Sequence, residues 1–146
     1  SERKMTLEEL FGDVIVAYTL ADAIADGNII RLDVIEFHQR DCAQYYKCPV
    51  YITNALYEQH KSAAMTAAEN DSEIANSILG ATIFDMLNMS VAEGRYKELS
   101  DSIRKFKYHL QKDRYTFHEH RIETVGQVGC GDEGEMIVTF MQACEL

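Results

Sequence analysis

The stretch DVIVAYTLADAIADGNIIRLD, residues 13–33, decides the fold that the sequence predicts. Its apolar run 14–18 is typical of a strand, and the residues from Leu20 to Ala25 predict a compact helix. Thr19 suits the N-cap because its hydroxyl can accept a hydrogen bond from an unpaired N–H. Gly27 suits the helix end, since glycine enters the left-handed region without a Cβ clash. The stretch therefore predicts a strand, a tight helix and a return, with an apolar face that needs a partner surface.

Length and composition predict a single globular domain, residues 1–146. The apolar content is 47% with one proline, which argues for a folded chain rather than a disordered one. No run of 18 apolar residues is present, so we expect no membrane span. The first residues lack the apolar core of a signal peptide. We therefore expect a cytoplasmic protein, and its four cysteines are expected to be free thiols.

The first half of the chain predicts further helices after the opening stretch. Asp33 is a good N-cap for a short helix over 34–42. Residues 45–49 are expected to be extended, because Pro49 pushes the residue before it out of the helical region. Thr53 is then predicted to cap a helix that continues through Ala68. The chain up to this point therefore alternates short extended segments with helices.

A longer apolar helix is predicted after a polar break at residues 69–72, and Gly94 is expected to close it. Apolar residues recur within it at three- and four-residue steps. Asp85 lies among these apolar residues. We expect its carboxylate to be exposed on the polar side of the helix. The alternative is a buried carboxylate with a basic partner from the strands.

The last third of the chain predicts an antiparallel β-meander. Residues 103–111 fit both helical and strand periods, and their aromatic residues favour a strand. Residues 115–128 and 136–141 predict two more strands, and the glycines of 129–134 are those that a hairpin turn demands. The predicted fold class is therefore α+β: a short N-terminal strand-helix unit, central helices and a C-terminal antiparallel β-meander.

No constellation of residues predicts a reaction. His38, Cys42 and Cys48 could form part of a zinc site, but no fourth ligand accompanies them. His118 and His120 share one face of a strand and could ligate a metal or flank a substrate. At both places we expect packing or exposed polar side chains instead. The sequence also has no phosphate-binding loop and no serine elbow, so it predicts no cofactor and favours a protein that is not an enzyme.

The charge distribution predicts an electrically two-sided molecule unless folding interleaves the two parts. The formal net charge is −10, which disfavours attraction to DNA or to anionic membranes. Residues 95–121 hold eight basic and four acidic residues, so the rest of the chain carries a charge of −14.

Two sets of charged residues are candidate binding sites. The first would meet a protein partner, and opposed charges would speed and orient docking more than set its affinity. This acidic set comprises Asp22, Asp26, Glu69, Asp71, Glu73, Asp132, Glu133 and Glu135. The alternative set would contact phosphates and stack the bases of single-stranded nucleic acid. It comprises Lys105, Lys107, Tyr108, Lys112, Arg114, Tyr115 and Arg121.

Four motifs, in order, resemble an uncharacterised family of small phage- and plasmid-encoded proteins. They are YTLADAIADG (18–27), PVYIT (49–53, at the start of a helix), IFDMLNM (83–89) and GCGDEGEMIVT (129–139). The chain departs from the pattern where Leu20 replaces a frequent arginine and where Met136 replaces a frequent proline. The resemblance brings no activity and no functional residue with it. It implies an accessory protein of a mobile element in the bacterial cytoplasm, and our hypothesis is an inhibitor of a CRISPR effector or a restriction enzyme.

Overall fold

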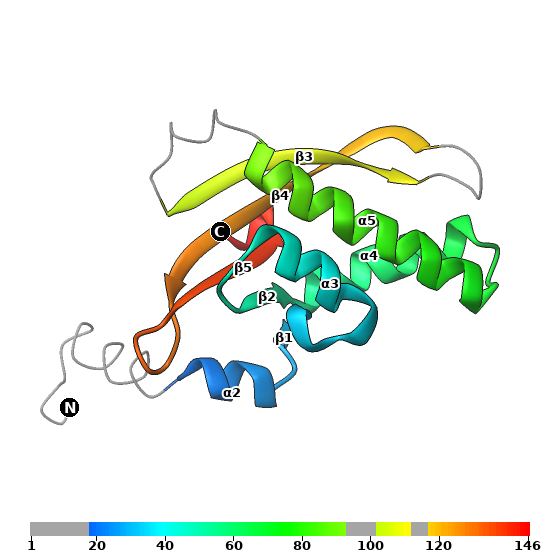
Figure 1. The fold of residues 1–146 in the computed structure, drawn as a ribbon. Helices are drawn as coiled ribbons and strands as arrows, with labels where there is room; N and C mark the ends of the chain where they lie inside the picture. Colours follow the sequence, from blue (N-terminus) through cyan, green and yellow to red (C-terminus); the bar gives the residue numbers. More distant parts are fainter. Residues whose placement is uncertain (1–17, 93–101, 112–116) are drawn as a thin grey trace, which may run out of the picture.

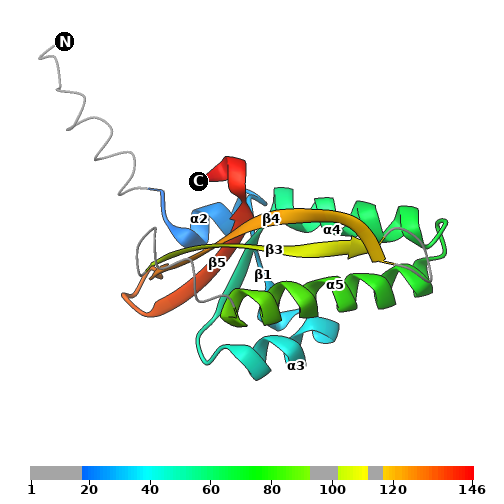
Figure 2. The same ribbon diagram turned by 90° about the horizontal axis from the view of Figure 1, so that it is seen from above.

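The computed structural model describes residues 18–92, 102–111 and 117–146, which form a five-stranded sheet with helices packed against it (Figure 1, Figure 2). The helices are α2 (Leu20–Ala25), α3 (Glu36–Tyr45), α4 (Asn54–Ala67) and α5 (Ser72–Ala92), with 3-10 turns η1 (Leu32–Val34) and η3 (Ala143–Glu145). The strands are β1 (Ile29–Arg31), β2 (Val50–Thr53), β3 (Ile103–Gln111), β4 (Phe117–Cys130) and β5 (Met136–Gln142). The predicted α+β class is confirmed.

The sheet joins the two ends of the described chain in the order β1-β2-β5-β4-β3. Strands β3, β4 and β5 form the predicted antiparallel meander. Strand β2 pairs in parallel with β5 and antiparallel with β1. The sequence does not predict β2, because its short apolar run cannot be separated from the start of the helix that follows it. Tertiary pairing therefore decides the structure of residues 50–53.

The opening stretch has the caps that its sequence predicts. The Thr19 hydroxyl accepts from the Asp22 N–H, and the Asp22 carboxylate accepts from the Thr19 N–H, each at 3.1 Å. This capping box satisfies two otherwise unpaired donors of α2. Gly27 follows the helix with a φ of +80°, in the left-handed region. Of the strand predicted over 14–18, only Tyr18 is described, and it lies in a bend; residues 14–17 lie outside the described residues.

The N-cap predicted at Asp33 is wrong. Helix α3 begins at Glu36 after Ile35, which makes no side-chain cap. The Asp33 carboxylate instead binds the guanidinium of Arg31 at 2.8 Å. A charge-assisted hydrogen bond is stronger than one to a neutral backbone N–H, so the nearby arginine takes the carboxylate. The cap predicted at Thr53 is confirmed, since its hydroxyl accepts from the Leu56 N–H.

The core lies between one face of the sheet and helices α3, α4 and α5. The rings of Phe106 and Phe140 meet edge to face at 5.9 Å, and Tyr46 packs on Phe140 at 6.0 Å. Gly126 lies opposite Phe140 in the β4–β5 ladder, where an added Cβ would lie 3.1 Å from the phenyl ring. A larger residue there would overpack the core. The glycine therefore makes room for the central aromatic ring.

Two buried histidines tie α4 to its neighbours. His60 on α4 lies 2.7 Å from the Tyr108 hydroxyl of β3, which lies 2.7 Å from the Thr124 hydroxyl of β4. His38 on α3 lies 2.9 Å from the hydroxyl of Tyr57 on α4. Burial lowers the pKa of both imidazoles to about 4. Both rings are therefore neutral at pH 7, and each hydrogen bond is made between neutral groups.

We predict that mild acid destabilises the protein through these imidazoles. The ordinary histidine pKa is near 6.5, so the unfolded chain takes up protons first. The neutral rings make their full contribution to the free energy of unfolding above about pH 6.5. That contribution is lost as the pH falls towards 4. For His60 the loss is about 2 kcal/mol at pH 5.

Urea unfolding at pH 7.5 and pH 5.0 measures this effect. The variant His60→Gln cannot titrate, so its stability should differ less between the two pH values than that of the wild type. Lys61→Gln changes the exposed neighbour on the same helix and should keep the wild-type difference. An undiminished difference in His60→Gln would contradict the prediction.

Candidate functional site

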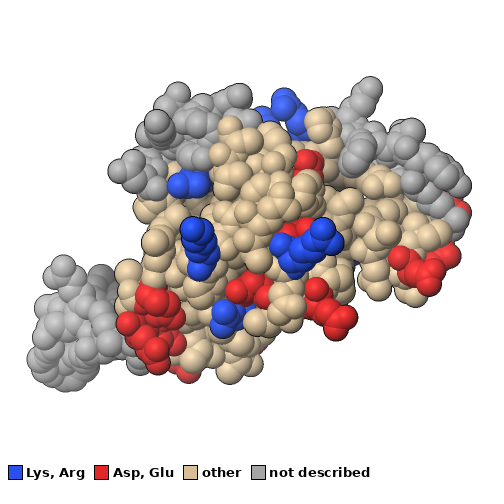
Figure 3. All heavy atoms as spheres, in the orientation of Figure 1, with Lys and Arg blue, Asp and Glu red and all other residues tan. Residues whose placement is uncertain are grey.

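One part of the predicted acidic set meets where α2 lies against the turn between β4 and β5. The two carboxylate oxygens of Asp132 accept from the N–H groups of Leu20 and Ala21 at 2.8 and 3.0 Å. These bonds join segments 112 and 111 residues apart in the chain. Acidic side chains gather at this end of the molecule on the face in Figure 3. We call this surface the acidic end; it comprises Asp22, Asp26, Asp132, Glu133 and Glu135.

Some carboxylates of the acidic end are already engaged in local hydrogen bonds. Asp22 belongs to the capping box of α2, and Asp132 holds the start of the same helix. Glu135 accepts from the Glu133 N–H at 3.0 Å. Within the part of the chain that the structure describes, the carboxylates of Asp26 and Glu133 make no hydrogen bond, and both residues are exposed. These two are the acids that a partner could engage without disturbing the fold.

The rest of the acidic set lies at the opposite end of the molecule, where α4 connects to α5 (Figure 1, Figure 3). The Asp71 carboxylate accepts from the N–H groups of Glu73 and Ile74 at 3.1 and 3.2 Å, so it caps α5. Glu69 takes a left-handed conformation in the connection, with a φ of 54°. The structure therefore does not bring the eight predicted acids together, but divides them between two ends.

The predicted nucleic-acid set is only partly at the surface. Lys105 and Lys107 are exposed on β3, and Arg121 is exposed on β4, on the sheet face opposite the helices. Tyr108 is 1% exposed and bonded to His60, so its ring cannot stack a base at the surface. The prediction for Tyr108 is therefore wrong, because the strand alternation turns it into the core. The remaining predicted residues, Lys112, Arg114 and Tyr115, lie outside the described residues.

Among the described residues, folding interleaves the two signs of charge. Lys107 lies directly opposite Glu123 in the ladder between β3 and β4. The acidic turn with Asp132 and Glu133 belongs to the same meander as the lysines of β3. On the face in Figure 3 basic side chains are scattered between the two acidic ends. On this face the described residues are thus acidic at both ends, with basic side chains between them.

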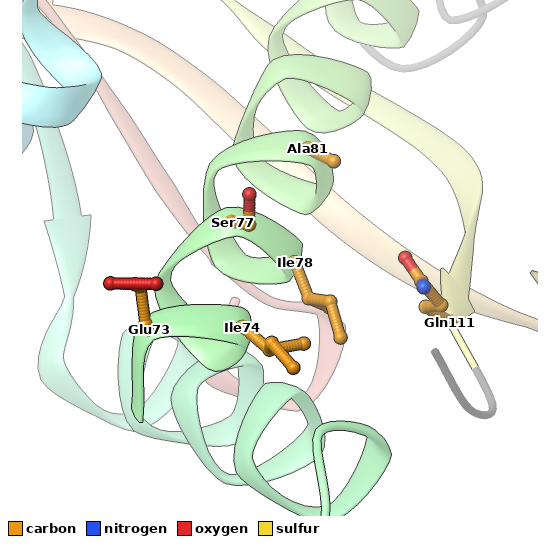
Figure 4. Close-up of a pocket in the computed structure, with 6 residues that line it drawn as sticks. All are labelled: Glu73, Ile74, Ser77, Ile78, Ala81 and Gln111. Carbon is orange, nitrogen blue, oxygen red and sulfur yellow. The ribbon is translucent and has the colours of Figure 1, made fainter. Parts of the chain in front are cut away.

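Two hollows that share Ala81 run along α5, and we call them together the α5 groove. The first has a volume of about 420 Å³ and is lined by Glu73, Ile74, Ser77, Ile78, Ala81 and Gln111. Figure 4 shows Glu73 on one side of it and Gln111 on the other, with Ile74 and Ile78 between them. The second has a volume of about 570 Å³ and is lined by Asp41, Gly80, Ala81, Phe84, Asp85 and His109.

Asp85 is half-buried in the α5 groove, which lies between the exposed carboxylate that the sequence favours and the buried one of the alternative interpretation. Burial raises the pKa of Asp85 above its ordinary value, and the backbone N–H and imidazole of His109 oppose that shift. The Val128 N–H donates to the Ser102 carbonyl, so these two residues form a hydrogen-bonded pair of the β3–β4 ladder. Because such pairs alternate along an antiparallel ladder, the even-numbered residues of β3 bond to β4. In that register the His109 N–H points away from β4. The Asp85 carboxylate therefore lies beside a backbone donor at the outer edge of β3, and no ion pair joins it to a lysine or arginine among the described residues.

The cysteines near α3 line a third hollow of about 350 Å³, which also includes Arg31 and Lys47. Burial raises the pKa of the Cys42 thiol to about 12, and also raises the pKa of Cys48. Cys42 is therefore a neutral thiol at pH 7, whereas metal binding and nucleophilic attack need the thiolate. Among the described residues, no three His, Cys, Asp or Glu side chains are grouped to hold a metal ion. The side chains of His118 and His120 lie outside that description.

We predict that Asp132→Ala loosens α2. The substitution removes both acceptors, so stability should fall by about 1 kcal/mol, as for other helix caps. The amides of Leu20 and Ala21 should exchange faster with solvent, measured by NMR hydrogen exchange. Glu133→Ala changes the next residue, whose carboxylate makes no hydrogen bond in the described chain, and should leave that exchange as it is. Unaltered exchange in Asp132→Ala would disprove the anchoring role.

We also predict that Asp85→Asn is at least as stable as the wild type at pH 7.5. Because the folded pKa is raised, the charge of Asp85 weakens the folded state at high pH, and protonation removes that cost as the pH falls. Asparagine keeps an oxygen for the His109 N–H, so the advantage over the wild type should shrink by pH 4 in urea unfolding. Asp85→Leu has no acceptor and should lose about 1–3 kcal/mol. Destabilisation of Asp85→Asn at pH 7.5 would refute this account.

Comparison with known proteins gives a family and no activity. A family model described as a family of unknown function, DUF6573, matches residues 8–145. No curated protein and no solved structure matches the chain. The match includes the acidic end and the α5 groove, so both surfaces lie within the family's domain. The chain therefore belongs to DUF6573, a family of unknown function.

Proposed function

We propose that the protein acts by binding another protein, as an accessory protein of a phage or plasmid, and that it inhibits a bacterial defence complex such as a CRISPR effector or a restriction enzyme. The observation that carries the proposal is the acidic end. There, Asp132 fixes α2 on the β4–β5 turn, and Asp26 and Glu133 are exposed beside it, where a partner could reach them.

The backbone that carries the acids of this surface is held in place before any partner arrives. Asp132 makes two hydrogen bonds to α2, and Gly134 takes a φ of +84° that lets the turn close. A surface that is ordered in the free protein loses less conformational entropy on binding. The acidic end is therefore suited to recognition, whereas acids on a disordered segment would serve only solubility.

The charge of the acidic end indicates the kind of target. Enzymes that hold nucleic acid do so in positively charged channels, as CRISPR effectors hold a guide-target duplex. Carboxylates of an inhibitor can occupy such a channel in place of phosphates. The net charge of −10 would attract the protein to it and orient the encounter. The proposal therefore favours a target that itself binds nucleic acid.

Charge reversal at the acidic end tests the proposal. In bacteria that carry a CRISPR or restriction system, the wild-type protein should raise the plating efficiency of a targeted phage. The double variant Asp26→Lys/Glu133→Lys should lose at least tenfold of that protection, because it would repel a basic channel. Glu36→Lys/Glu58→Lys makes the same charge change at exposed sites away from the acidic end and should protect like the wild type.

Two results would overturn the proposal. One is the absence of protection by the wild type against a panel of CRISPR and restriction systems, with no defence protein retained on the immobilised protein. The other is salt-sensitive binding of labelled single-stranded DNA that is lost in Lys105→Glu/Lys107→Glu, which would favour the nucleic-acid alternative instead.

A further inference from the structure

Helix α5 is apolar on more sides than the core covers. It spans 21 residues, and its most apolar 18-residue window has a mean hydropathy of 1.2, which by length and composition alone would allow a membrane span, yet only 44% of that window is buried. Ile83 and Met86 face the core, whereas Phe84 remains 37% exposed and Ala81 is exposed as well. The exposed side of α5 therefore mixes these apolar residues with polar ones such as Asn76 and Ser77, as on a helix face that meets a partner.

The exposed side of α5 is shaped for a close neighbour. Ser77, Gly80 and Ala81 lie three and four residues apart, so these small residues form a shallow depression on one side of the helix. A Cβ added at Gly80 would meet no atom within 4 Å. Glycine within a helix costs about 1 kcal/mol relative to alanine. Packing inside the described chain does not require that glycine, whereas close approach of a second helix would use it.

Acids stand at both ends of the α5 groove. Glu73 lies at one end, and Asp41 and Asp85 lie at the other. Among the described residues that line the groove there is no lysine and no arginine. Positions 73 and 85 are 12 residues apart on α5, which corresponds to about 18 Å at a helical rise of about 1.5 Å per residue. The groove therefore combines an apolar floor with negative charge at two points a fixed distance apart.

This charge pattern argues against a second copy of the chain and against a lipid surface. An antiparallel copy of α5 would place Glu73 of each molecule against Asp85 of the other, and like charges repel. Anionic lipids would meet the same acids. A segment with positive charge at both ends is the complementary occupant.

We infer that the α5 groove is a docking site for an amphipathic helix of a partner protein, with apolar side chains along one face and lysine or arginine at both ends, about 18 Å apart. The inference rests on the proposed function only for the class of partner, a protein, and it uses a surface distinct from the acidic end. The small residues of α5 let the partner helix approach closely. Phe84 and Ile74 contact its apolar face, and the acids at the two ends of the groove fix its register.

A synthetic peptide tests the site without knowledge of the natural partner. The probe is a labelled helical peptide with leucines on one face and two lysines at each end, and its twin has glutamates in place of the lysines. Fluorescence polarisation should show binding of the lysine peptide to the wild-type protein and none of the glutamate twin. Ala81→Arg fills the middle of the groove and should weaken binding at least tenfold.

Asn76→Arg is the matched control, since it adds the same side chain at an exposed position of α5 outside the groove. It should bind the lysine peptide like the wild type. Urea unfolding of both variants checks that each keeps its fold. If a variant fails to fold, shifts of the Ser77, Ala81 and His109 NMR signals of the wild type on addition of peptide locate the site instead.

Several outcomes would overturn the inference. They are equal binding of the two peptides, no binding of either, and equal loss of binding in both arginine variants. Sedimentation that shows a dimer which Ala81→Arg dissociates would assign the groove to a second copy, and co-sedimentation with phosphatidylcholine vesicles abolished by Ala81→Arg would assign it to lipid. The variant Asp26→Lys/Glu133→Lys should keep peptide binding. A negative result in the phage-protection assay would therefore count against the proposed function, and a negative result in the peptide-binding assay would count against the groove.

Discussion

In the parallel ladder between β2 and β5, Val50 lies opposite Val138 and Ile52 lies opposite Phe140, and the rest of the structure depends on this pairing. It brings residues near position 50 into the middle of a sheet whose other strands come from the end of the chain. Helices α3 and α4 flank β2 in sequence, so the same pairing places them over the core. A parallel pair needs a long connection between its strands, and here that connection contains α4, α5 and two strands of the meander.

Helix α4 then carries the contacts that hold the layers together. Tyr57 on one side of the helix meets His38 of α3, and His60 meets Tyr108 of the sheet. Each pair places a neutral imidazole beside a hydroxyl in the interior, where the hydrogen bond offsets part of the cost of burying polar groups, while the Nδ1 atom of each ring has no partner among the described residues. Since hydrogen bonds are directional, these pairs fix the rotation of α4 more closely than apolar packing alone would. The position of α5, and so of its groove, follows from the helix beside it.

The features predicted correctly from sequence are the ones set by near neighbours. Thr19 and Thr53 cap their helices through residues three positions away, and β3 shows its alternation within one short run. The features that the sequence did not predict depend on distant residues. Strand β2 exists because β5 lies beside it, and Asp132 holds a helix that is 112 residues away in the chain. For the same reason the sequence does not predict that the eight acids lie at two separate ends of the molecule. It also predicts Tyr108 at the surface, although a hydrogen bond to His60 holds it in the core.

The outer edge of β3 has a consequence for how the protein behaves at high concentration. Among the described strands β3 ends the sheet, and the unpaired backbone groups of such a strand can recruit the strands of other molecules into aggregates. Asp85 lies beside the His109 N–H at that edge, and Lys105 and Lys107 place exposed positive charges on the same strand. Two copies meeting edge to edge would bring lysine against lysine. Both features therefore oppose amyloid-like association through the β3 edge.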